Sequence, residues 1–280
     1  MISLNINKES NFVKSHWENM SKKFGIDLKS TTKTITIKKL EINALSQAIN
    51  YIIGQNLKVK NILEFGCGNG YNCFALSREF RNIDFTGVDY VQDMVNNAKT
   101  IAETEGCENI RYMVGDILEI DKIELFPAYD IVFTDRCIIN LDSVEKQKKA
   151  ICQLVSKIAD GGYLILIENI LQTYNKQNSC RKLMGLEERI PAPYNLFLDD
   201  NFVIECAKEL ALQLVNIHDF GSLHDLFLYV ILPKMNDSTI NYDDPIVDAI
   251  TDFCINTTEL TKNQFGEFGQ NRLYLFKKGC

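Results

Sequence analysis

A short glycine-rich segment carries the clearest chemical signal in this chain of 280 residues. Gly66, Gly68 and Gly70 alternate within EFGCGNG (64–70), directly after an apolar stretch. Glycine tolerates the positive φ of a sharp turn and lets a ligand approach the backbone, because it has no Cβ. A helix that begins after the turn points its free N–H groups at that ligand. The segment therefore predicts a ligand-binding turn between a strand and a helix.

The acidic residue before the turn distinguishes this segment from a dinucleotide site. A pyrophosphate site favours GxGxxG, whereas here the third glycine comes one residue early. The carboxylate of Glu64 suits a cationic ligand better than a pyrophosphate. S-adenosylmethionine carries a sulfonium and an ammonium group and meets this requirement. A tight structural turn without any ligand is the alternative that the segment alone leaves open.

Two further carboxylates follow the next two expected strands. Asp89 comes nineteen residues after Gly70, where it can accept hydrogen bonds from both hydroxyls of a ribose. Asp116, with the neighbouring N–H of Ile117, can read the edge of an adenine, although such an aspartate alone is more often a helix cap or turn residue. Ligands in open α/β sheets bind at the carboxyl ends of the strands. Three such features at successive strand ends therefore favour an adenosyl site.

From Lys58 onward, short apolar segments alternate with helical ones. Strands are expected at 60–65, 83–89, 110–115, 129–134 and 162–168, with helices at about 70–80, 91–105 and 143–159. Such alternation predicts a parallel sheet that is covered on both faces, with right-handed crossovers. Two later strands, at 212–220 and 272–278, could close the sheet as a distant hairpin. We therefore expect a doubly wound, mostly parallel, seven-stranded Rossmann-like sheet with helical cap insertions.

Three regions follow from this pattern. They are a helical cap or lid at 1–57, the cofactor-binding core at 58–170, and a substrate cap at 171–280 made of helical insertions plus the last two strands. Within the first region, TTKTITIKK (31–39) is expected to be extended. The first insertion, 171–210, is expected to be helical with a loop at 191–195, and a second insertion spans 220–270. All three additions should lie over the carboxyl ends of the strands, where the fold tolerates insertion.

The motifs in their order resemble those of the class I S-adenosylmethionine-dependent methyltransferases. The resemblance covers residues 58–170 and rests on EFGCGNG, GVD, GDI, YDIVFTDR and the segment GGYLILIEN. It implies S-adenosylmethionine as cofactor, with the methionine part near the glycine turn, the ribose at Asp89 and the adenine at Asp116. The cofactor contacts that we expect are Glu64, Gly66, Cys67, Gly68, Asn69, Asp89, Tyr90, Met94, Asp116, Ile117 and Thr134.

A narrower resemblance concerns the substrate. The segment HWENM (16–20) with the N-terminal region that follows it, and TDRCIINL (134–141), are similar to a bacterial subgroup associated with surface-glycan or natural-product pathways. This resemblance hints at a small-molecule acceptor.

Methyl transfer is an in-line displacement, so the enzyme mainly aligns the nucleophile, the methyl group and the sulfur. A hydroxyl acceptor also needs a base, for which His218 and His224 are candidates, with structural histidines as the alternative. Arg136, after the fourth strand, could hold an acceptor carboxylate or phosphate, the methionine carboxylate, or only a salt bridge. We assign catalytic roles to His224, His218 and Arg136, and substrate contacts to Lys33, Arg136, Tyr194 and Asn195.

A metal-dependent mechanism is the alternative for the same strand ends. Asp135 and the pair Glu168-Asn169 could hold magnesium through three oxygen ligands. Because Asp135 could instead cap a helix, and because Glu168 stands where magnesium-dependent relatives have an aspartate, we expect no metal.

The composition limits the remaining function classes. The net charge of −7 and the lack of a basic stripe argue against nucleic-acid binding, and no apolar run reaches the length of about 18 residues that a membrane helix needs. The start shows no signal-peptide pattern, and nine cysteines without a CxxC pair indicate reduced thiols in a cytoplasmic protein. The oligomeric state stays open.

The sequence therefore predicts an S-adenosylmethionine-dependent enzyme that methylates a small molecule. We expect O-methylation of a sugar, a nucleotide-linked compound, or a phosphorylated or carboxylated metabolite. The alternatives are methylation of protein or RNA by the same fold, and a non-catalytic regulator that binds the cofactor.

Overall fold

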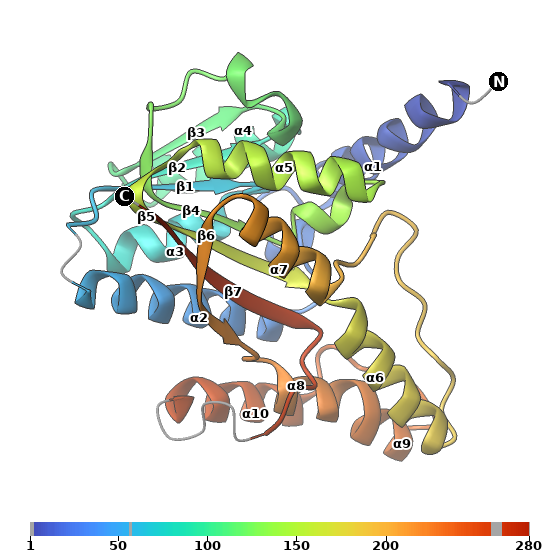
Figure 1. Ribbon diagram of the computed structural model, residues 1–280. Coiled ribbons are helices and arrows are strands. Elements are labelled where there is room, and N and C mark those ends of the chain that lie inside the picture. The colour runs from blue at the N-terminus through green and yellow to red at the C-terminus, as the bar shows by residue number, and fades with distance from the viewer. Residues whose placement is uncertain (1–2, 56–57, 259–264, 280) are drawn as a thin grey trace.

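A computed structural model describes residues 3–55, 58–258 and 265–279. Its centre is a seven-stranded sheet with the order β3-β2-β1-β4-β5-β7-β6 (Figure 1). The strands β1 to β5 are parallel, whereas β7 runs antiparallel to both β5 and β6, so the expected hairpin of distant strands and the fold class are confirmed. The strands are β1 (Asn61–Phe65), β2 (Asp84–Asp89), β3 (Ile110–Val114), β4 (Tyr129–Asp135), β5 (Ile158–Asn169), β6 (Leu212–His218) and β7 (Asn271–Lys278).

The register of the sheet brings the predicted motifs to one edge. Phe65, the last residue of β1, pairs with Val88 of β2 and with Thr134 of β4. Asp89 and Asp135 each follow one of these partners directly, so the glycine turn and both carboxylates start from the same level of the sheet.

Helices cover both faces of the sheet (Figure 1). On one face lie α2 (Ile35–Gly54), α3 (Tyr71–Glu79) and α4 (Gln92–Thr104). On the other lie α5 (Val144–Ser156) and α7 (Asp200–Glu209), together with the short turns η2 (Ile117–Lys122) and η3 (Ile138–Asn140). Each face buries its own apolar cluster, as the doubly wound pattern requires.

The N-terminal region differs from the expectation in two ways. Residues 35–39 are not extended, because Thr34 accepts a hydrogen bond from the N–H of Thr36 and caps α2. The apolar residues Leu45, Ile49 and Ile52 of α2 are fully buried against the sheet. Helix α2 is therefore part of the core as well as of the cap. The boundary that we drew at residue 57 separates this helix from the sheet against which it packs.

The remaining helices build the cap. They are α1 (Ser3–Phe24), η1 (Leu28–Ser30), α6 (Leu171–Leu183), α8 (Ser222–Leu226), the π-helical turn η4 (Phe227–Ile231), α9 (Leu232–Met235) and α10 (Pro245–Asn256). The C-terminus lies at the amino ends of the parallel strands, since Lys277 pairs with Tyr163 of β5. In Figure 1, α1 and α6 lie toward the opposite end of the sheet.

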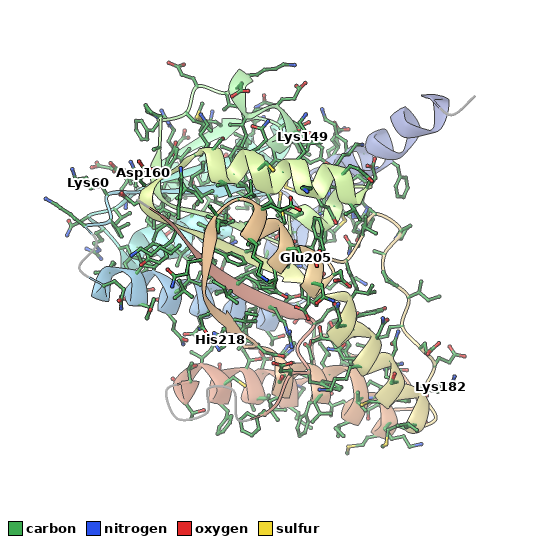
Figure 2. All side chains as sticks on the ribbon, in the orientation of Figure 1. Lys60, Lys149, Asp160, Lys182, Glu205 and His218 are labelled. Carbon is green, nitrogen blue, oxygen red and sulfur yellow. The ribbon has the colours of Figure 1, made fainter. Side chains whose placement is uncertain are left out.

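Figure 2 marks charged side chains such as Lys60, Asp160, Lys182 and Glu205 around the outside of the molecule. Within the described residues, no helix is both long and apolar enough to cross a membrane. The eight cysteines among these residues are free thiols.

Candidate active site

The glycine turn is held against the neighbouring strand. The N–H groups of Gly66 and Cys67 both donate to the carbonyl of Val88, at 2.8 and 3.0 Å. Gly66 and Gly68 have φ angles of +74° and +53°, which residues with a side chain rarely adopt. A Cβ on Gly68 would lie 2.5 Å from the Cγ2 of Thr31. The alternating glycines are thus required both by the backbone and by the close approach of the cap.

Asp89 lies directly beside this turn. Its carboxylate accepts the N–H of Gly68 and the N–H of Val91, both at 2.9 Å. Burial raises the pKa of Asp89 to about 6, even though these hydrogen bonds favour the charged form. A carboxylate fixed by two backbone donors keeps lone pairs for two further hydroxyl donors, as a ribose would supply.

One cavity of about 720 Å³ runs from the glycine turn to the cap. It is within the range of about 300–1,000 Å³ that is usual for small-molecule sites. Of the expected cofactor contacts, the cavity wall contains Gly66, Cys67, Gly68, Asn69, Asp89, Tyr90, Met94, Asp116 and Ile117. The structure therefore brings together residues from the ends of three successive strands, β1, β2 and β3.

Glu64 and Thr134 do not reach this wall, contrary to expectation. Glu64 is buried beneath the turn, where it accepts hydrogen bonds from Asn72 Nδ2 at 2.8 Å and Cys73 Sγ at 3.0 Å, and burial raises its pKa to about 7. Thr134 donates to Glu168 Oε1 at 2.8 Å. Side chains alternate along a strand, so Phe65 next to Glu64 reaches the cavity instead.

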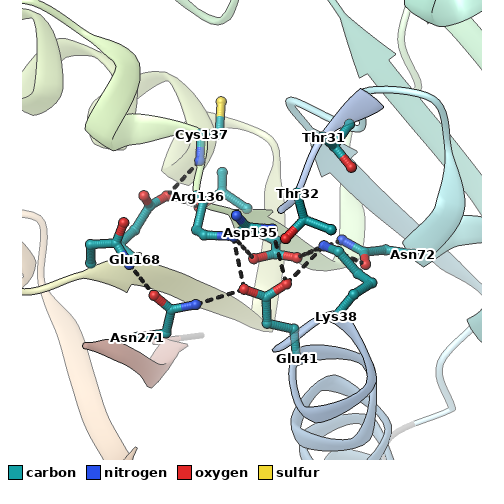
Figure 3. Close-up of polar contacts among 12 residues, drawn as sticks. Thr31, Thr32, Lys38, Glu41, Asn72, Asp135, Arg136, Cys137, Glu168 and Asn271 are labelled. Carbon is teal, nitrogen blue, oxygen red and sulfur yellow. Dashed lines mark hydrogen bonds and ion pairs between the residues drawn. The ribbon is translucent and has the colours of Figure 1, made fainter. Parts of the chain in front are cut away.

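A buried ion cluster that the sequence analysis missed lies at the ends of β4 and α2 (Figure 3). Lys38 Nζ lies 2.9 Å from Glu41 Oε2, and it also contacts Asp135 Oδ2 and Asn72 Oδ1. Arg136 Nε lies 2.8 Å from Glu41 Oε1. We call Lys38, Glu41, Asp135 and Arg136 the strand-end cluster. The two positive charges balance the two negative charges. In the sequence, only the spacing of Lys38 and Glu41, which is that of neighbours on one helix face, could have indicated this cluster.

Opposite charges favour the ionised forms of Lys38 and Asp135, whereas burial outweighs them at Glu41 and raises its pKa. Burial alone would lower the pKa of Lys38, but the carboxylates of Asp135 and Glu41 outweigh burial and raise it. Burial alone would raise the pKa of Asp135, but Lys38 and Arg136 lower it. The guanidinium of Arg136 lines the cavity yet is engaged by Glu41 through both Nε and Nη2. Its expected role as an anion clamp for the acceptor therefore loses its support, because Glu41 already neutralises it.

The two histidines expected to act in catalysis are not on the cavity wall, which corrects that prediction. His224 is buried, with Nδ1 at 2.9 Å from Asp225 Oδ1 and Nε2 at 3.0 Å from Thr36 Oγ1. The Nε2 contact joins α8 to the start of α2, whereas the Nδ1 contact lies within α8, because Asp225 is the next residue of that helix. His218 is buried at the end of β6, in a separate hollow near Phe220, and Figure 2 marks it there.

The part of the cavity under the cap is aromatic. Lys33, Tyr194 and Asn195, which we predicted as substrate contacts, lie on the cavity wall. His16 of α1 also lines it and stacks on Tyr194, with ring centroids 4.1 Å apart and an interplanar angle of 24°. Trp17 meets the same tyrosine edge-on at 5.6 Å. A role for His16 could not be predicted from the sequence, because nothing in the sequence places α1 against the loop at 191–195.

The alternative of a magnesium site at Asp135, Glu168 and Asn169 has no support in the geometry, because other protein groups engage all three side chains. Asp135 pairs with Lys38, while Glu168 accepts hydrogen bonds from the Thr134 hydroxyl and from the N–H groups of Ile138 and Ile139. Asn169 Nδ2 donates to Asn271 Oδ1. In residues 3–55, 58–258 and 265–279, no group of three or more His, Cys, Asp or Glu side chains is arranged to hold a metal ion.

Comparison with known proteins identifies the family. Residues 56–193 match the family model described as a methyltransferase domain. Residues 56–193 are thus a methyltransferase domain, and the sheet has the class I fold of S-adenosylmethionine-dependent methyltransferases. This chain is 27% identical over 183 residues to the ajmaline N-methyltransferase of Rauvolfia serpentina, which covers 62% of this chain and 60% of that relative. It is 25% identical over 116 residues to the malonyl-[acyl-carrier protein] O-methyltransferase of Bacillus anthracis, which covers 41% of this chain and 40% of that relative.

Solved structures show the same fold. This chain superposes on magnesium protoporphyrin IX methyltransferase (ChlM) from Synechocystis PCC 6803, crystallised with S-adenosylhomocysteine, with a TM-score of 0.55 and 13% identity over the full length of both chains. The similarity to the two sequence relatives spans less than two thirds of either of them.

Proposed function

We propose that this protein binds S-adenosylmethionine and transfers its methyl group to a hydroxyl group of a small molecule. The observation that carries the proposal is the single cavity, which joins the glycine turn and Asp89 to an aromatic chamber under the cap. A nucleoside-type cofactor occupies the first part, which leaves the second for the acceptor. Side chains of α1 and of the loop at 191–195 form part of the wall of the second part, where they can align the two reactants.

The residues of the first part have distinct roles in this proposal. Asp89 accepts hydrogen bonds from the ribose hydroxyls, and Asp116 with Ile117 binds the adenine edge. Tyr90 and Met94 flank the adenosine. Gly66 and Gly68 give the turn its positive φ angles and let Cys137 and Thr31 pack against it, and we place the methionine part beside this turn.

His16 is the base that we propose in place of His224 and His218. Burial lowers the pKa of His16, so its ring is neutral at pH 7 and can accept a proton. The acceptor oxygen attacks the methyl carbon, the carbon–sulfur bond breaks toward sulfur, and the acceptor proton passes to His16. S-adenosylhomocysteine and a methyl ether leave the site.

Two alternative functions, methylation of protein or RNA and non-catalytic regulation, differ from this proposal in what they require. A protein or RNA acceptor would need an open approach to the methyl group, whereas α1 and the first insertion both contribute side chains to the wall over it. A non-catalytic regulator would bind cofactor without transfer. Assaying S-adenosylhomocysteine formation with a panel of hydroxylated sugars, nucleotide sugars and aromatic acids separates these functions, because a regulator forms no product with any of them.

The role of His16 can be tested with His16→Gln, and His218→Gln provides a matched buried histidine outside the cavity. We expect His16→Gln to lower kcat about 100-fold at pH 7, within the range for a general base, with unchanged S-adenosylhomocysteine affinity in calorimetry. The defect should shrink at high pH, where the acceptor ionises unaided. An equal loss of kcat in both variants would contradict the assignment.

A further inference from the structure

A second arginine on the cavity wall has a different environment from Arg136. Arg189 lies in the segment 184–199, which runs from α6 to α7 as a long trace in Figure 1. Its guanidinium carbon lies 3.4 Å from the ring centroid of Tyr229 and 4.9 Å from that of Tyr174, and all three residues line the cavity. Stacking on aromatic rings fixes the plane of a guanidinium without neutralising its charge.

The hydrogen-bond partners of Arg189 are neutral. Its Nη1 donates to Gln177 Oε1 at 2.6 Å, and its Nη2 donates to Gln270 Oε1 at 2.5 Å. No carboxylate in the described part of the chain forms an ion pair with Arg189. A guanidinium has five N–H donors, so these two bonds orient the group and leave donors for a ligand.

The charges around Arg189 add to this excess of positive charge. Arg181 is buried nearby and donates only to backbone carbonyls, those of Glu187 and Tyr229. Burial lowers the pKa of Arg181, and the charge of Arg189 lowers it further. Asp225 reaches the same wall, where its carboxylate accepts hydrogen bonds from Gln177 Nε2 and the N–H of Gln270 and contacts His224 Nδ1. This one negative charge offsets only one of the two arginines.

We propose that Arg189 binds the acidic group of the acceptor, and that the acceptor is a flat aromatic acid. The inference rests on the proposed function and names the substrate class of that site. A carboxylate accepts two parallel N–H bonds from one guanidinium, so Arg189 can fix both its position and its orientation. The rings of His16, Trp17 and Tyr194 on the same cavity supply the apolar surface against which a flat body packs.

Trp17 provides the measurement, because it is the single tryptophan of the chain and lines this chamber. Benzoate and its neutral analogue benzamide are titrated at constant ionic strength into the protein, with and without saturating S-adenosylhomocysteine, while tryptophan emission is recorded. We expect benzoate to bind at least tenfold more tightly than benzamide. Equal affinities, or no response to either probe, would overturn the inference without any variant being needed.

Two variants then assign the effect to one residue. Arg189→Gln should weaken benzoate binding at least tenfold and leave benzamide within twofold. Arg111→Gln is the matched control, since Arg111 lies 4.8 Å over Phe126 outside the cavity, and it should leave both affinities unchanged. Benzoate binding that survives Arg189→Gln would refute the anchor. Calorimetry with S-adenosylhomocysteine tests the proposed function separately. If S-adenosylhomocysteine does not bind, the benzoate titration of the free protein still tests the role of Arg189.

Discussion

The two arginines that we compare on the cavity wall differ in their partners: Arg136 lies beside carboxylates, whereas Arg189 is held by neutral groups. Arg136 lies in the strand-end cluster, where Glu41 and Asp135 lie beside it and Lys38 completes a neutral set. Arg189 lies in the cap, where two amides and two tyrosines hold it. A buried charge whose partners are supplied by the protein maintains structure, whereas an oriented charge without a counter-charge is available to a ligand.

This difference also separates the two halves of the site. On the cofactor side, groups are fixed by strand ends that the sheet register aligns. On the acceptor side, the wall comes from α1, the segment 184–199 and η4, which meet only in the folded molecule. The first half is built by the strand-end motifs of the matched methyltransferase domain, and the second is where we place substrate choice.

The largest expected effect comes from removing a partner inside the strand-end cluster. Glu41→Ala should lower the free energy of unfolding by about 3–5 kcal/mol, because it leaves Lys38 and Arg136 buried beside a single carboxylate. Urea denaturation measures this change. Glu105→Ala, which breaks an exposed pair with Arg78, is the control and should cost less than about 1 kcal/mol. If Glu41→Ala is as mild as the control, the contrast between the two arginines fails.

A smaller effect is expected from the pH dependence of cofactor binding. The pKa of Asp89 is raised to about 6 in the free protein, and ribose hydroxyls donate to its ionised form. S-adenosylhomocysteine affinity should therefore be constant above about pH 7 and fall about tenfold for each pH unit below 6, since one pKa unit equals about 1.4 kcal/mol.

Asp89→Asn gives the control for this titration. Calorimetry across pH 5–8 should show weaker binding for this variant, with a nearly flat profile. A slope that persists in Asp89→Asn would assign the titration to another carboxyl such as Glu64, whose pKa is raised to about 7, and would remove Asp89 from the ribose.

The smallest expected effect concerns metal removal. Incubation with excess EDTA should leave turnover unchanged, because Asp135, Glu168 and Asn169 are all engaged by other protein groups. Initial rates with and without EDTA, and with added magnesium, measure this. Loss of turnover that magnesium restores would return these three residues to the role of metal ligands and would break the assignment of Asp135 to the strand-end cluster.

The cofactor half was predictable from the sequence for a local reason. A turn that needs positive φ requires glycine, and Asp89 and Asp116 follow strands whose apolar residues identify them. The strands at 60–65 and 272–278 were predicted within one residue of the observed β1 and β7. Glu64 and Thr134 were misplaced because a strand end does not reveal which face each side chain takes.

The acceptor half was decided by tertiary structure alone. His16 and Tyr194 are 178 positions apart, yet their rings stack because α1 and the first insertion meet over the strand ends. The neutral partners of Arg189, Gln177 and Gln270, likewise come from other segments, and so does Glu41, the carboxylate that engages Arg136 most closely. Short-range steric requirements leave a trace in the sequence, whereas the pairing of charges across the cavity depends on how helices pack.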